Sequence, residues 1–66
     1  MKITVNGEEL EVEAGLTVAQ LVAQHNYEPQ HVAVEVNEDL VTRTKHEATA
    51  LKEGDQVEIV TMVGGG

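Results

Sequence analysis

The chain has 66 residues and a formal net charge of −8, and it contains no cysteine, serine, phenylalanine or tryptophan. That length allows one small domain with a core of valine, leucine and isoleucine, but not a deep substrate cavity. Without cysteine and serine, no residue can form a disulfide, a thiolate metal site or a Ser or Cys nucleophile. The acidic balance argues against nucleic-acid and anionic-membrane partners.

The first predicted element is a β-hairpin. Apolar and polar residues alternate over 2–6 and again over 8–13, and Asn6-Gly7 lies between the two runs. Both residues of an Asn-Gly pair tolerate the positive φ of a two-residue hairpin turn. The pattern therefore predicts two antiparallel strands at about these positions.

A helix is predicted over 18–25. Thr17 can act as its N-cap, and Gln20, three residues later, completes a capping box. Asn26 suits the left-handed residue that follows a helix, and Pro29 lies just beyond it. One stripe at helical spacing should face the core, with its histidine at the core boundary: Val18, Leu21, Val22 and His25.

The second half of the chain predicts strands again. Valines alternate over 32–36, a turn follows at 37–39, and 40–42 indicates a short strand. We expect 43–50 to be a polar connection with one helical turn, and Val57 and Ile59 to point inward from a last strand. The order ββαβββ is typical of an α+β, β-grasp (ubiquitin-like) fold, a mixed sheet of about five strands wrapped round one helix.

The chain closes on Gly64-Gly65-Gly66, which are half of its six glycines. Glycine lets a backbone approach other groups closely at the cost of order. We interpret 1–62 as the domain and 63–66 as a flexible tail, which reaches at most ~14 Å when extended. The Gly66 carboxylate is then the candidate reactive group; the alternative is a frayed end without function.

Val60 and Met62 alternate with the inward residues of the last strand, so both should be exposed beside the tail. We interpret them as a docking patch for a partner, although isolated surface hydrophobes are also common. The three histidines lack metal-ligand spacing, so no metal site is expected. The glutamates at 8, 9, 11 and 13 indicate a solvated face rather than an acid–base pair.

Five segments stand out together by their order and spacing: 1–8, 16–21, 32–37, 51–60 and the final Gly65-Gly66. With these segments the chain resembles a known family, the sulfur-carrier (ThiS) proteins of thiamine biosynthesis, relatives of ubiquitin and of the molybdopterin-synthase small subunit. Two positions depart from the pattern of many members: Thr42 stands where they have proline, and His46 where they often have tryptophan.

The resemblance implies a carrier that is a co-substrate and not an enzyme. A ThiF-like adenylating enzyme would join the Gly66 carboxylate to AMP from ATP, and sulfur from a persulfide donor would convert it to a thiocarboxylate. A ThiG-like thiazole synthase would then take the sulfur. The resemblance implies no bound cofactor, and we expect a cytoplasmic monomer. Sulfur delivery to molybdopterin or another cofactor, a ubiquitin-like protein modifier and an inert interaction module remain alternatives.

Overall fold

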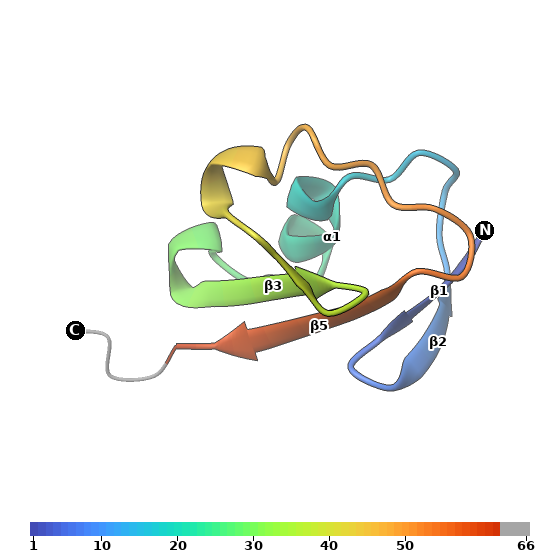
Figure 1. Cartoon of the computed structure of the whole chain (residues 1–66), viewed down its shortest axis with the longest axis horizontal. Helices are drawn as coiled ribbons and strands as arrows, with labels where there is room; N and C mark the ends of the chain where they lie inside the picture. Colours follow the sequence, from blue (N-terminus) through green and yellow to red (C-terminus); the bar gives the residue numbers. More distant parts are fainter. Residues whose placement is uncertain (63–66) are drawn as a thin grey trace.

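A computed structural model describes residues 1–62; residues 63–66 lie outside the described part of the chain. Over residues 1–62 the elements follow the predicted order ββαβββ, with two short 3-10 helices added (Figure 1). The strands and helices are β1 Lys2–Val5, β2 Glu8–Glu11, α1 Val18–Gln24, η1 Pro29–His31, β3 Val32–Val36, β4 Asp39–Val41, η2 Arg43–Lys45 and β5 Gln56–Thr61.

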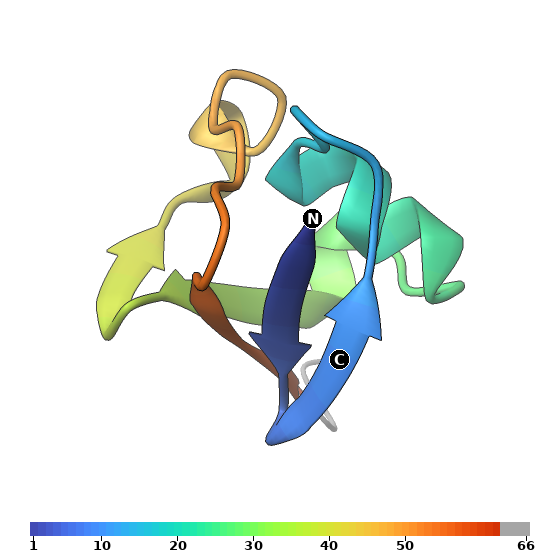
Figure 2. The same ribbon diagram turned by 90° about the vertical axis from the view of Figure 1, so that its right-hand side faces the viewer.

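The described strands form one mixed sheet in the order β2-β1-β5-β3-β4. Strand β1 pairs in parallel with β5, and the other neighbours are antiparallel. Helix α1 packs across one face of this sheet, and the hairpin β1–β2 lies at one end of it (Figures 1 and 2). This is the predicted β-grasp arrangement, and it places β5, the last of the described strands, at the centre of the sheet.

The Asn-Gly turn forms where the sequence predicts it. Asn6 has φ 51° and Gly7 has φ 84°, both in the left-handed region. Glycine adopts this region without strain, and asparagine does so more easily than most residues. The turn sets the register of the hairpin, in which Val5 lies opposite Glu8 and Ile3 opposite Leu10.

Helix α1 begins as predicted and ends one residue earlier. The Thr17 side chain accepts a hydrogen bond from the Gln20 amide at 3.1 Å, and the Gln20 side chain accepts one from the Thr17 amide at 2.9 Å. Asn26 has φ 62°, the expected left-handed conformation. The prediction that His25 lies at the core boundary is wrong: it is the C-cap and is exposed. The helix ends at Gln24, so the His25 side chain does not continue the buried stripe. Its ring Nδ1 lies within hydrogen-bond distance of the Leu21 carbonyl oxygen.

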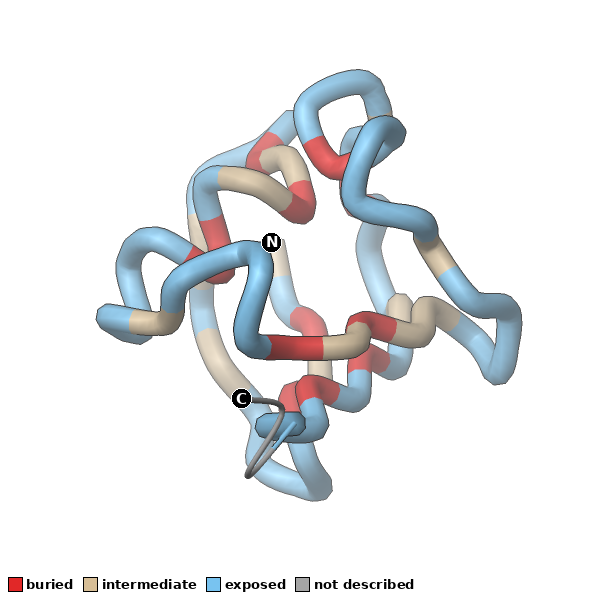
Figure 3. The backbone as a smooth tube through the Cα atoms, turned by 90° about the vertical axis from the view of Figure 1, so that its left-hand side faces the viewer, coloured by how far each residue is buried: buried red, intermediate tan, exposed pale blue. Residues whose placement is uncertain are grey.

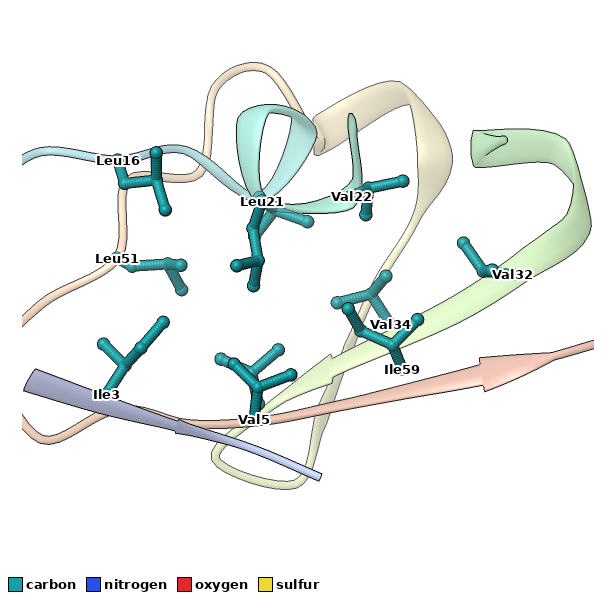
Figure 4. Packing of buried hydrophobic residues seen from close by; sticks show 11 residues of the cluster. Ile3, Val5, Leu16, Leu21, Val22, Val32, Val34, Leu51 and Ile59 are labelled. Carbon is teal, nitrogen blue, oxygen red and sulfur yellow. The ribbon is translucent and has the colours of Figure 1, made fainter. Parts of the chain in front are cut away.

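The core lies between α1 and the inner face of the sheet (Figures 3 and 4). Leu21 and Val22 point from the helix toward Val5, Val34 and Ile59 on the strands (Figure 4). Leu10, Val12 and Val36 are partly buried and pack against the margin of this core. The fully formed cluster contains Ile3, Val5, Leu16, Val18, Leu21, Val22, Val32, Val34, Leu51, Val57 and Ile59.

The turn between β3 and β4 is tighter than predicted. Asn37 and Glu38 both have positive φ, 52° and 72°, which is the geometry of a two-residue hairpin turn. Asp39 therefore already pairs with Val36, and β4 runs over Asp39–Val41 rather than 40–42. The sequence pattern missed this because glutamate is uncommon at a left-handed position.

Candidate functional site

The candidate site is the end of β5, where the described chain leads into the glycine tail. Strand β5 is paired on both sides, with β1 in parallel and with β3 in antiparallel register. Its pairing with β3 runs from Val57 opposite Val36 to Thr61 opposite Val32. The amide of Met62, the last described residue, donates to the His31 carbonyl at 2.8 Å. The base of the tail is therefore held by backbone hydrogen bonds as far as the structure describes it.

A side chain from the first hairpin completes the support of β5. Strand β1 pairs with β5 only through Thr4 and Val5. Beyond Val5 the chain turns away from β5, and the Asn6 side chain forms the next hydrogen bonds to the backbone of β5. Its Oδ1 accepts from the Ile59 amide at 2.8 Å, and its Nδ2 donates to the Ile59 carbonyl at 3.2 Å. The sequence indicated a turn role for Asn6 but gave no signal of this contact across 53 positions.

The start of β5 is fixed in a similar way by the β3–β4 turn. The Asn37 side chain accepts from the Gln56 amide at 3.0 Å and donates to Asp55 Oδ1 at 2.9 Å. The other carboxylate oxygen of Asp55 accepts from the Lys52 amide at 2.8 Å. The side chains of Asn37 and Asn6 thus bind the backbone of β5, the strand that leads to the candidate reactive end, at two separate points.

Val60 and Met62 lie where the sequence predicts, on the outward face near the end of β5. Val60 is 58% exposed and Met62 is 49% exposed. Val60 lies opposite Ala33 of β3, so a small side chain leaves it open to a partner. Their exposure is confirmed, and their docking role stays a prediction. The predicted tail residues Gly64, Gly65 and Gly66 lie outside the described residues.

The histidines form no metal site in the part of the chain that the structure describes. Over residues 1–62, no group of three or more His, Cys, Asp or Glu side chains could hold a metal ion. His46 is only 3% exposed, and its Nε2 lies 3.2 Å from the Val41 carbonyl oxygen. Its own carbonyl accepts from the Ala19 amide at 3.0 Å. His46 thus ties the connection after β4 to the first turn of α1, a structural role that the polar sequence around it did not reveal.

The predicted helical turn in that connection is confirmed as η2, which precedes His46 directly.

The odd-numbered glutamates of β2 lie on one face of the sheet, because side chains alternate between the two faces along a strand. Glu9 lies opposite Thr4 and Glu11 opposite Lys2, on the outward side of the sheet. Both are exposed, as predicted for a solvated face.

Among residues 1–62, no helix is both long and apolar enough to cross a membrane.

The sequence model of the ThiS family matches residues 2–66, which include the three terminal glycines. The chain is 44% identical over its whole length to a thiazole synthase from Magnetococcus marinus, but it spans only 20% of that relative. It is also similar to the crystal structure of a thiamine biosynthesis protein (ThiS) from Geobacter metallireducens. That match has a TM-score of 0.85 and 35% identity, and it covers 100% of both chains.

A ubiquitin-like protein from the archaeon Caldiarchaeum subterraneum matches with a TM-score of 0.56 over 98% of this chain and 100% of the archaeal one. At 23% identity, that likeness supports the fold alone. The family match extends over nearly all of the sequence and agrees with the β-grasp sheet and its central last strand. The chain therefore belongs to the ThiS family.

Proposed function

We propose that this chain is a sulfur carrier in thiamine biosynthesis and that its reactive group is the Gly66 carboxylate. The observation that carries the proposal is the family match, which runs through the final glycine. The geometry of β5 supports it, because a strand anchored up to Met62 presents the following four residues from a fixed base.

The proposed chemistry follows from the weakness of a carboxylate as an acyl donor. Attack on a carboxylate would have to expel oxide, so the group must first be activated. An adenylating enzyme joins the Gly66 carboxylate to AMP from ATP and releases pyrophosphate. A persulfide sulfur then attacks the acyl carbon, and AMP leaves. A thiol cleaves the resulting acyl disulfide, which leaves the thiocarboxylate on Gly66 and oxidises the thiol to a disulfide.

The consumer of this sulfur is proposed to be thiazole synthase. The Magnetococcus marinus thiazole synthase contains, within one chain, a segment 44% identical to the whole of this chain. Joining two partners in one chain raises their effective concentration, so such an arrangement suits proteins that react with each other. In this scheme the chain itself supplies no acid, base or metal, and it acts as a protein co-substrate.

Intact-mass spectrometry tests the proposal. The purified chain is incubated with the adenylating enzyme, ATP, a persulfide donor and a thiol. We expect a gain of about 16 Da, the difference between sulfur and oxygen on the terminal acyl group. A ladder of conjugates on lysines would identify a protein modifier instead, and an unchanged mass would contradict the proposed function.

The docking patch, defined as Val60 and Met62, gives a second prediction. Replacing Val60 with asparagine keeps the size but removes an apolar contact, without adding a charge. If the patch is buried against the adenylating enzyme, the loss of about 1 kcal/mol should weaken binding about fivefold. Isothermal calorimetry with the adenylating enzyme measures the change.

Leu40→Asn is the matched control for Val60→Asn. Leu40 is 63% exposed and also faces outward, but it lies on the edge strand β4, opposite Glu35 of β3. It is therefore outside the patch, and its replacement should leave the affinity nearly unchanged. Equal affinities for the Val60 variant and the unmodified chain would rule out the patch.

A further inference from the structure

Asn6 and Gly7 form a dipeptide that is chemically reactive as well as a turn, since asparagine is a thermolabile residue. The Gly7 amide nitrogen can attack the side-chain carbonyl carbon of Asn6, which closes a succinimide ring and releases ammonia. Glycine favours this attack because it has no Cβ to hinder the approach. Water then opens the ring and leaves aspartate or isoaspartate. The two other asparagines of the chain, Asn26 and Asn37, precede tyrosine and glutamate instead.

The fold leaves the Asn6-Gly7 turn open to water. Gly7 is exposed. Apart from its neighbours in sequence, no atom of residues 1–62 lies within 4 Å of the position that a Cβ would take on Gly7. Burial therefore does not protect this dipeptide, and any protection must come from the way the Asn6 side chain is held.

The Asn6 side chain is held by strand β5. Its Oδ1 accepts from the Ile59 amide at 2.8 Å, and its Nδ2 donates to the Ile59 carbonyl at 3.2 Å. Nδ2 is also the atom that would leave as ammonia. The Asn6 backbone amide donates to the Val57 carbonyl at 2.9 Å. Ring closure would require the side chain to release both bonds to Ile59, so the reaction needs the hairpin to separate from β5 first.

We propose that Asn6 is a deamidation site that the fold controls: the reaction is blocked while Asn6 binds β5 and proceeds in chains that have opened. The product cannot restore the native contacts. A carboxylate has no hydrogen to donate to the Ile59 carbonyl, and it places a negative charge beside that oxygen. Isoaspartate also adds a methylene to the main chain of a two-residue turn, whose geometry sets Val5 opposite Glu8.

The loss of ammonia makes the change irreversible, so each opening of the fold adds to a pool of weakened chains. The weakened contact lies on β5, the strand that leads to the glycine tail, whatever chemistry the tail performs. Deamidation at Asn6 would therefore convert a transient unfolding event into a permanent loss of support for that strand.

Peptide mapping by mass spectrometry tests the proposed control by the fold. The full chain is kept folded or unfolded in guanidinium chloride, at the same pH and temperature. Deamidation adds about 1 Da to the peptide that contains Asn6. Its rate should be about tenfold or more lower in the folded chain, because the fold must open first. Asn26 and Asn37 are internal controls, and in the unfolded chain both should react more slowly than Asn6.

Asn6→Asp isolates the effect of the product, and Asn26→Asp is its matched control. Asn26 also has a positive φ, 62°, and is exposed. None of the contacts described for residues 1–62 joins its side chain to β5. Each variant adds one negative charge, but only Asn6→Asp loses a hydrogen bond to β5. Its ratio of unfolded to folded chain should therefore rise about tenfold relative to the control, as measured by urea unfolding.

Equal rates at Asn6 in the folded and unfolded chains would overturn the proposal, because the bonds to Ile59 would then give no protection. So would an unfolded chain in which Asn6 does not react, or reacts no faster than Asn26 and Asn37. If Asn6→Asp and Asn26→Asp unfold at the same urea concentration, β5 tolerates the product and the proposed weakening is wrong.

Discussion

A chain that ends at Gly65 should lose sulfur charging by about 100-fold or more, although it still ends in two glycines. The reason is reach. Each extended residue spans at most ~3.6 Å, so the shortened chain presents its carboxylate that far from the position of the native one. Misplacing a reacting atom by about 1 Å can already cost 10²-fold in rate. The readout is the rate of the mass gain with the adenylating enzyme, ATP and a sulfur donor.

The fold should survive this deletion. The described core extends no further along the sequence than Ile59, and the last described backbone pairing is that of Met62 with His31. The free energy of unfolding should therefore change little. Gly64→Ala, which keeps the length of the chain, is the matched control and should retain charging. A truncated chain that is charged as fast as the full one would show that the position of Gly66 is not critical.

Leu21→Ala should give the largest loss of stability. Leu21 is 0% exposed and points from α1 into the centre of the core (Figure 4). Emptying such a position costs about 2–5 kcal/mol, through lost burial and the cavity left behind. A domain of this size has a total stability of roughly 3–10 kcal/mol, so the variant should be close to unfolding at ambient temperature.

Urea unfolding followed by circular dichroism measures this change. Leu40→Ala removes the same atoms from a side chain that is 63% exposed, and it should cost less than about 0.5 kcal/mol. Similar losses for the two variants would mean that the core does not centre on the face of α1 that carries Leu21.

Local sequence signals predicted most of the fold. The Asn6-Gly7 turn and the capping box of Thr17 and Gln20 each depend on residues at most three positions apart, and both formed as expected. The alternation over the last strand correctly separated inward Val57 and Ile59 from outward Val60. Short-range patterns of this kind are reliable because turn and cap chemistry act within a few residues.

The parts that the sequence did not reveal depend on long-range contacts. The Asn6 side chain supports β5 from 53 positions away, and His46 is buried although its neighbours are polar. Nothing within a few residues of either one indicates a distant partner. The exposed His25 is the opposite case, because a correct helical period was extended one residue past the end of the helix. The position of Glu35 opposite Glu58 likewise depends on the register of β3 and β5, which only the assembled sheet defines.

Fragment mass spectrometry of the reacted chain tests the role of the terminal carboxyl group most directly. We expect the gain of about 16 Da on the fragment that ends in Gly66, and we expect it to be lost again when thiazole synthase and its other substrates are added. A gain on any other residue, or a sulfur that thiazole synthase cannot remove, would contradict it.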